Sequence, residues 1–331
     1  MLGYGDDFVT PNFTLTVGDT DYTNVIRDRL LEIRLTDVNG DRSDYLEITL
    51  DDRETIIRPE HGASLLFSLG YNETGLYKKG IYGHDKTEYS GPPKTMIITA
   101  TSVNFRKSLK STRTRSFTDI TLSDLVTTIA SDHGYQYRVD EFLATIHIPH
   151  LFQTAETDLH LLTRLANQYD ASFKVQGNML LFMSKGLHTK EEYKDILPTF
   201  TLAPGDISRW NVSRKDRMRY GSVVASWYDG NAAKTMKETA GSGEPVHELT
   251  FKYPTAQEAA VAAQSKLNQF NRAQATVSLT LPGNPKLVAE GGLILQDFRD
   301  GVDGEYTITR VEHILNKTIG YQCQVEAELT L

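Results

Sequence analysis

Short segments in which polar and apolar residues alternate fill the first hundred residues of the chain. Alternation with a period of two is typical of strands that bury one face and expose the other. Asn39-Gly40 and Gly91-Pro92-Pro93 supply turn residues between such segments. Short strands separated by turns predict an antiparallel barrel or sandwich. The predicted strands are Phe13–Val17, Leu31–Leu35, Tyr45–Leu50, Ser64–Leu69, Ile81–Tyr89 and Met96–Ala100.

A similar pattern returns near the end of the chain and suggests an internal repeat. Gly80 and Gly304 are each followed by a tyrosine two positions later and a glutamate eight positions later. A glycine-led apolar segment precedes each of them, at 62–69 and at 292–296. Unrelated barrels also produce such coincidences, and that alternative stays open. A repeat would matter because two similar units in a chain let a trimer present six nearly equivalent units around a ring.

The middle of the chain has helical rather than alternating periodicity. Thr121 to Asp124 forms a capping-box-like start, and Gly134 is placed to end the helix that follows. A second helix is predicted from Glu156 to Tyr169, with Glu156 and Asp158 at the positive end of its dipole. Gly177-Asn178 predicts a hairpin between two further strands. This part is α+β.

Strands resume from about Phe200, together with one more helix. Residues 229–247 are rich in Gly, Ala, Lys and Glu, and we expect an exposed, mobile loop there. A capping box at Thr255 and Glu258 opens a helix at about 255–273, whose stripe of small residues predicts close packing onto a sheet. That stripe is Ala256, Ala260, Ala263, Leu267 and Phe270. The predicted strands are Val223–Tyr228, Gly292–Gln296, Glu305–Ile314 and Tyr321–Leu329.

These patterns predict an α+β, mainly β protein with two antiparallel β-barrels and a small α+β domain inserted between them. The length of 331 residues suits two or three domains at about 150 residues each. We place the first barrel at residues 1–106, the inserted domain at 107–196 and the second barrel, with its packed helix, at 197–331.

Charge and composition exclude several classes of protein. With 35 basic and 43 acidic residues the formal charge is −8, which is unsuited to a general nucleic-acid binder. The hydrophobic fraction of 39% excludes wholesale disorder. No apolar run approaches the roughly 18 residues that span a bilayer, and Met1–Phe8 does not resemble a signal peptide. The single cysteine, Cys323, rules out intrachain disulfides, so we expect a soluble protein folded in a reducing compartment.

Each candidate for chemistry has a simpler structural explanation. His147, His150 and His160 resemble a metal cluster, but Pro149 spoils the helical spacing and no nearby ligand completes the set. The segment 297–305 has calcium-loop residues without the EF-hand spacing, and turn chemistry explains it better.

Two further candidates for catalytic residues also have simpler structural explanations. Asp51 and Asp52 are neighbours on a strand and point to opposite faces, so they do not form a glycosidase pair. Cys323 lies in a terminal strand, where we expect a buried thiol rather than a nucleophile. We therefore assign no catalytic, cofactor-binding or metal-binding residue and predict that the chain is not an enzyme.

A basic run from Arg106 to Arg115 carries no acidic residue. It lacks the interleaved aromatic residues of a single-strand binder. We therefore favour a solvated connection between domains, or docking onto an acidic partner, over a phosphate contact. Its charged residues are Arg106, Lys107, Lys110, Arg113 and Arg115.

Several stretches, in order and spacing, resemble the phage late control D proteins, the baseplate hub proteins of contractile-tailed phages. In the first barrel they are Pro11-Asn12-Phe13, Leu31–Val38, Ser43-Asp44, Leu50-Asp51-Asp52, Gly62 and Leu69-Gly70-Tyr71. In the middle they are Lys110–Phe117, Thr121–Asp124, Ile129-Ala130, Gln153, Glu156-Thr157-Asp158 and Leu162–Ala166. Near the end they are Val302–Ile308, Val311–His313 and Gly320-Tyr321. The similarity spans nearly the whole chain.

The resemblance implies a homotrimeric virion protein, made in the host cytoplasm and placed in the tail baseplate of a phage or prophage. Its two tail-tube-like barrels would form a pseudo-six-fold ring that joins the tail tube to the central spike. The implied partners are the spike, tube and tape-measure proteins, with DNA only as passing cargo and no membrane insertion. The family also resembles the N-terminal hub of type VI secretion spike proteins, whose chains continue beyond it, so we expect the spike here to be a separate polypeptide.

An acidic chain would suit a channel that lets DNA slide, because like charges resist adsorption; a strongly basic channel wall would contradict this expectation. Two other functions stay open at this point. One is a carbohydrate-binding or receptor-binding β protein, and the other is a tail-associated cell-wall hydrolase.

Overall fold

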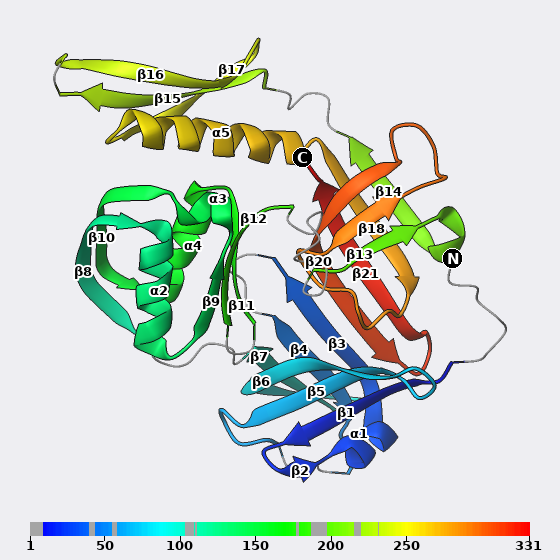
Figure 1. The fold of residues 1–331 in the computed structure, drawn as a ribbon. Helices are drawn as coiled ribbons and strands as arrows, with labels where there is room; N and C mark the ends of the chain where they lie inside the picture. The colour runs from blue at the N-terminus through cyan, green and yellow to red at the C-terminus, as the bar shows by residue number, and fades with distance from the viewer. Residues whose placement is uncertain are drawn as a thin grey trace.

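Two β-rich units share one 13-stranded sheet in the computed structural model (Figure 1). The structure describes residues 9–39, 44–54, 58–102, 109, 111–176, 179–186, 197–214, 220–230 and 232–331. An α+β insert lies beside the two units, and a smaller layer of one helix under three strands lies next to the insert (Figure 1).

The first unit is an antiparallel sheet with the strand order β1-β5-β6-β7-β4-β3. Its alternating residues bury one face, as in β4, where Leu46, Ile48 and Leu50 are all fully buried. All six strands predicted in this part of the chain are present. The elements are β1 (Pro11–Val17), β2 (Thr20–Asp21), α1 (Thr23–Arg29), β3 (Leu30–Val38), β4 (Tyr45–Asp51), β5 (Ser64–Tyr71), β6 (Gly75–Ser90) and β7 (Thr95–Ser102).

The second unit has the strand order β13-β19-β20-β21-β18-β14, in which only β13 and β19 run parallel. The three strands predicted for the end of the chain are present. The elements are β13 (Thr199–Leu202), a 3-10 turn η4 (Pro204–Asp206), β14 (Arg209–Arg214), β18 (Ala275–Pro282), β19 (Gly292–Leu295), β20 (Gly304–Asn316) and β21 (Gly320–Leu329).

The two units share one strand order and differ in the direction of the first strand, which is antiparallel to its partner in β1 and parallel in β13. If the six main strands of each are numbered along the chain, both sheets have the order 1-4-5-6-3-2. A bulge interrupts β6 between His84 and Lys86 and interrupts β20 at the matching place, between Ile308 and Arg310. Gly80 and Gly304 also share an unusual backbone, with φ of 144° and 153°. The repeat predicted from the sequence is therefore confirmed.

The prediction of closed barrels is wrong for the described strands. The end strands β1 and β3 of the first unit do not pair with each other there. Instead β3 pairs with β20 of the second unit, so the edge that would close the first barrel joins the two sheets. One hydrophobic core consequently runs through both units, from Phe67 and Ile48 to Tyr306 and Val325.

The insert contains a two-stranded ribbon, a three-stranded mixed sheet and helices packed between them. The predicted capping box is present, since the Thr121 hydroxyl accepts from Asp124 N and the Asp124 carboxylate accepts from Thr121 N. Gly134 ends the helix with φ of 67°. The elements are β8 (Thr112–Thr121), α2 (Leu122–His133), β9 (Gln136–Val139), α3 (Glu141–Ala144), β10 (His147–Thr157), α4 (Asp158–Gln168), β11 (Ala171–Gln176) and β12 (Met179–Ser184).

The second predicted helix begins later than expected. Thr157 is its N-cap and accepts a hydrogen bond from His160 N, so Glu156 belongs to β10 and not to the first helical turn. The strands on either side of Gly177-Asn178 pair as predicted. That turn itself lies outside the described residues, as do Gly40 and three charged residues of the basic run, Arg106, Lys107 and Lys110.

Residues 229–247 are not the exposed loop that their composition suggested. They contain β16 and the start of β17, both paired with β15. Strand β16 is hard to recognise in the sequence because its exposed face carries Thr235, Lys237 and Thr239, whereas Ala240 is its one buried side chain. The elements of this layer are β15 (Ser222–Asp229), β16 (Lys234–Gly241), β17 (Val246–Tyr253) and α5 (Ala256–Arg272).

Helix α5 packs on this sheet through small residues, as predicted, but the stripe is partly different. Ala263 and Leu267 are buried, whereas Ala260 is exposed and Ala259 takes its place. The helix is covered on a second side because Val261 packs against the core of the insert. Among the described residues, no helix is long and apolar enough to cross a membrane.

The repeated glycine-tyrosine motif gives a matched pair of substitutions. The buried Tyr306 hydroxyl donates to Val302 O at 2.7 Å, and the Tyr82 hydroxyl donates to Lys79 O at 3.3 Å. We expect Tyr306→Phe to lower the free energy of unfolding by about 1–2 kcal/mol, because it leaves a buried carbonyl without its donor. Tyr82→Phe should cost less, since the bond it removes is longer. Urea unfolding compares the two, and an equal or reversed effect would contradict the assignment.

Candidate functional site at the junction of the two units

The junction between the units is a run of main-chain pairing. Arg310 lies opposite Val38 and Asn316 opposite Glu32, so the second half of β20 continues the first unit's sheet beyond β3. Glu312 lies near the centre of this contact and is 5% exposed. It forms ion pairs of 3.2 Å with Arg34 and with Arg310, one from each unit.

A lysine of the first unit contacts residues of the second unit next to the β3–β20 pairing. Lys79 of β6 donates to Pro285 O at 2.6 Å and to His313 Nε2 at 3.0 Å. Burial lowers the pKa of Lys79 to about 8. Burial, with Lys79 beside it, also lowers the pKa of His313, so the neutral ring can accept at Nε2 and donate from Nδ1 to the Tyr321 hydroxyl 2.8 Å away.

The insert is attached to the same junction by a buried ion pair. Lys174 of β11 lies 2.7 Å from Asp37 of β3, whose other carboxylate oxygen accepts from Ala289 N at 2.9 Å. Burial acts to raise the pKa of Asp37, but the charge and hydrogen bond of Lys174 outweigh it and the pKa is lowered. Three parts of the chain therefore meet at one carboxylate.

Two further contacts attach the insert to the second unit and to α5, one made by β11 and one by the residue just before it. Ser172 donates to Glu290, which is 4% exposed and whose pKa is raised by burial. Arg272, at the end of α5, pairs with Asp170 and lies 3.2 Å from Glu328 of β21. The insert, α5 and the second unit are thus connected by buried polar contacts.

A cavity of about 380 Å³ lies where these parts meet. Asp44 lines it, and burial raises the pKa of this carboxyl to about 7. The other charged residues on its wall are Asp37, Lys78, Lys79, Lys174, Lys286 and Glu290.

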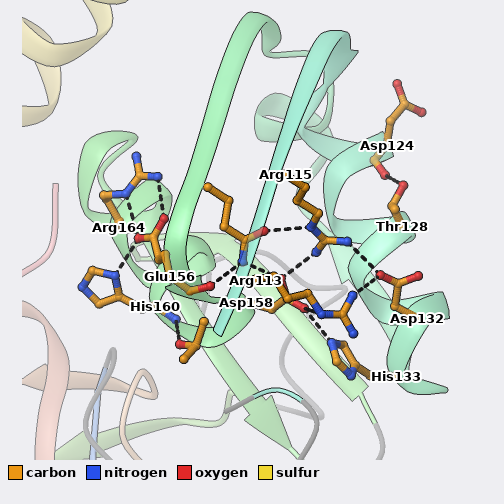
Figure 2. A network of polar contacts seen from close by, with 12 residues as sticks. Arg113, Arg115, Asp124, Thr128, Asp132, His133, Glu156, Asp158, His160 and Arg164 are labelled. Atoms are coloured by element: carbon orange, nitrogen blue, oxygen red, sulfur yellow. Dashed lines mark hydrogen bonds and ion pairs between the residues drawn. The ribbon is translucent and has the colours of Figure 1, made fainter. Parts of the chain in front are cut away.

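Within the insert, a second polar network connects the ribbon to the helices (Figure 2). Asp158 at the start of α4 is fully buried and accepts from Arg115 at 2.6 Å and from Gln153 at 2.8 Å. His133 at the end of α2 lies 2.7 Å from its other oxygen. Burial acts to raise the pKa of Asp158, but these hydrogen bonds outweigh it and lower the pKa.

This network explains part of the sequence motif that supported the family resemblance. Arg164 contacts both carboxylate oxygens of Glu156, at 3.0 and 2.9 Å, and His160 lies 2.6 Å from the first of them (Figure 2). In this segment, Glu156 therefore pairs with Arg164 and Asp158 pairs with Arg115. The side chains of His133 and Asp158 are both fully buried, which keeps this acid–histidine pair away from solvent.

The prediction that the basic run is a solvated connection between domains is wrong for Arg113 and Arg115. Both lie in β8 and both contact Asp132, at 2.7 and 2.9 Å. Arg115 also stacks over Phe117 at 4.9 Å from the ring centroid. Their charges are satisfied by acids of the insert itself.

The structure places the other candidate residues apart. His147 pairs with Asp119 at 2.8 Å, whereas His160 pairs with Glu156. Within the described parts of the chain, no three His, Cys, Asp or Glu residues converge on a possible metal site. Cys323 is buried, as predicted, and burial raises the pKa of its thiol to about 11.

The remaining two candidates have local roles. In the calcium-like segment, Asp303 accepts from Phe298 N at 2.9 Å, and Asp297 and Gly301 have positive φ, which is the predicted turn chemistry. Asp51 forms an ion pair with Arg53, two residues further along the chain.

The fold is thus a mainly β, duplicated open sheet with an α+β insert, and the parts are held together at one polar junction. The chain belongs to the phage tail baseplate hub family, whose model matches residues 107–319. A baseplate hub is a component of the virion tail baseplate.

Curated relatives agree with this assignment. The chain is 30% identical to the probable baseplate hub proteins of Escherichia phage 186 and Escherichia phage P2, over 98% of this chain and 94% of each relative. Solved structures share the fold at lower identity. The 43 kDa tail protein of prophage MuSo2 from Shewanella oneidensis matches 96% of this chain and 98% of its own at 15% identity, with a TM-score of 0.69. A tail protein from Neisseria meningitidis matches 96% of each chain at 11% identity, with a TM-score of 0.71.

Removal of the lysine at the junction should be costly. We expect Lys174→Met to lower the free energy of unfolding by about 3–5 kcal/mol, because Asp37 is left buried without its counter-charge. The double variant Asp37→Asn/Lys174→Met should recover part of the loss. Lys237→Met, which breaks the exposed Lys237–Glu248 pair, serves as control and should change stability by at most about 1 kcal/mol. Equal effects of the two lysine substitutions in chemical denaturation would contradict the buried role.

The raised pKa of Asp44 predicts a specific pH dependence. The folded pKa of about 7 exceeds the ordinary value of 3.8, so ionisation of Asp44 costs stability as the pH rises from about 4 to about 7. Asp44→Asn keeps the oxygen that accepts from Val38 N at 3.2 Å and removes this cost. We expect the variant to become steadily more stable than the native chain across that interval in urea unfolding. A constant difference between the two would contradict the prediction.

Proposed function

We propose that this chain works by assembly and without catalytic turnover. In this proposal three copies close into a ring of six tube-like units around a central channel. The ring joins the six-fold tail tube on one side to a three-fold spike on the other, and DNA passes through it. Residues 1–106 and 197–331 supply the two tube-like units, and residues 107–196 form the inserted domain.

The duplicated topology is the observation that carries the proposal. A ring of identical single units has one kind of joint, whereas this chain already contains one joint between two like units, β3 with β20. Three copies of the chain around an axis have three-fold symmetry, and their six like units have nearly six-fold symmetry. That combination fits a position between a tube and a spike of different symmetry.

Known proteins of similar fold support a place among other tail components. The c3393 protein of Escherichia coli, described as a component of the type VI secretion system with similarity to T4 tail proteins, matches 96% of this chain and 77% of its own. Its identity is 11% and its TM-score 0.59. The spike, tube and tape-measure proteins are the partners that we propose here.

The proposal predicts the solution state of the purified chain. Light scattering should give three times the chain mass of 37.1 kDa, and electron microscopy of the same sample should show rings with a central opening. A solid particle of that mass, or a chain that stays monomeric at assembly concentrations, would contradict the proposal.

A further inference from the structure

Among the strands that the structure describes, two edges lack the partner that their counterparts have. In the second unit, β20 pairs with β21 on one side and with β19 and then β3 on the other. In the first unit, β6 pairs with β7 and β5 in the same way, but the segment Lys86–Ser90 pairs only with β7 within the described chain. At the other end of the large sheet, β14 pairs only with β18 among the described strands.

These two edges are the counterparts of the two strands that form the internal junction. By position in the repeat, β6 corresponds to β20 and β14 corresponds to β3. We propose that the Lys86–Ser90 edge of β6 in one copy of the chain pairs with β14 of the next copy, in the antiparallel register that β20 uses with β3. This inference rests on the proposed ring and names the contact that closes it.

The register follows from residue partners that are already paired within each unit. In the first unit, Arg34 lies opposite Glu47, Glu47 opposite Thr99, and Thr99 opposite Lys86. The same path in the second unit connects Asn211, Ser278, Glu326 and Arg310. Asn211 is therefore the counterpart of Arg34, and Lys86 is the counterpart of Arg310.

The internal junction then fixes the new pairs. Arg34 lies opposite Ile314, four residues beyond Arg310, so Asn211 should lie opposite Ser90, four residues beyond Lys86. The antiparallel direction gives the neighbouring positions. The expected pairs between copies are Ser90 with Asn211, Tyr89 with Val212, Glu88 with Ser213 and Thr87 with Arg214.

Exposed aromatic side chains lie on both edges, one within the proposed pairs and one next to them. Tyr89 is 55% exposed, whereas its counterpart His313 is fully buried. Trp210 is 41% exposed, whereas its counterpart Ile33 is fully buried. In the proposed register, Tyr89 packs against Val212 of the next copy, as His313 packs beside Leu35 within the chain. Large apolar side chains at an unpaired strand edge are otherwise a liability for a soluble protein.

The polar residues of the internal junction also have counterparts at the free edge. Lys86 and Glu88 form an ion pair of 2.7 Å, as Arg310 and Glu312 do at 3.2 Å. Within the chain, the Thr36 hydroxyl donates to Glu312 at 3.4 Å. Ser213 holds the position of Thr36 and can donate to Glu88 in the same way.

Each copy carries one edge of each kind, so the contact is head-to-tail. Head-to-tail contacts close into rings when the rotation between units divides a full turn. Three copies joined this way alternate internal and external joints around the ring.

Cysteine cross-linking tests this register directly. Glu88→Cys and Ser213→Cys in one chain should give a covalent trimer under mild oxidation, because side chains directly opposite across an antiparallel pair lie about 4.5–5.5 Å apart. The control combines Glu88→Cys with Val212→Cys, which shifts one partner by a residue and turns it to the other face. The native Cys323 is buried in both variants. Cross-linked species should form in the first variant and stay at the level of single-cysteine chains in the control.

A disruptive substitution gives a second, independent readout. Tyr89→Arg should reduce the mass in solution from trimer to monomer, a threefold loss. Ile81→Arg changes an equally apolar side chain of the same strand, 42% exposed but outside the proposed edge, and should leave the trimer intact. Circular dichroism of both variants checks that each is folded.

The outcomes separate this inference from the proposed function. A native trimer in which the matched cysteines do not cross-link, or in which the shifted pair cross-links equally well, would overturn the register and leave the ring standing. A trimer that survives Tyr89→Arg would also overturn the contact. A native chain that stays monomeric would overturn both.

Discussion

Main-chain pairing between β3 and β20 is the constraint on which the rest of this structure depends. It joins the strands of the two units with directional hydrogen bonds, so the relative orientation of the units is fixed by geometry as well as by burial of apolar surface. A contact of apolar side chains alone would tolerate sliding. Paired strands do not, because a shift of one residue would turn every core side chain of β3 toward solvent.

Buried charges reinforce this pairing and connect it to the insert. Glu312 pairs with arginines from both units, and Asp37 pairs with Lys174 of the insert. Such pairs are poor sources of net stability, since desolvation offsets much of their attraction, but the loss of one partner is costly. Their effect is therefore specificity: the parts fit in one arrangement, and alternatives leave a charge buried alone.

The local structure was largely predictable from the sequence, because it depends on residues close together in the chain. Alternation gave the strands of the first unit, and the capping residues Thr121 and Gly134 gave the bounds of α2. The repeat was visible in the spacing of Gly80 and Gly304 before the two topologies could be compared. Strand β16 was missed because polar residues occupy most of an exposed strand and obscure its period.

The junction itself could not be predicted in this way. Asp37 and Lys174 are 137 residues apart, and no local pattern connects them. The same holds for Arg115 and Asp158, whose charges are evident in the sequence but whose pairing is not. The prediction of closed barrels was wrong because the partner of an edge strand is far away in the sequence and no local pattern identifies it. Here β20 of the second unit pairs with the edge of β3.

The covalent connection between the two units has a consequence for how such a protein associates. A joint made within one polypeptide forms at an effective concentration set by the connecting chain, so it persists at any dilution. Only joints between polypeptides respond to how much protein a cell has made. In the proposed ring, a duplicated chain therefore halves the number of joints that must form between polypeptides, from six to three, and leaves abundance to control those three.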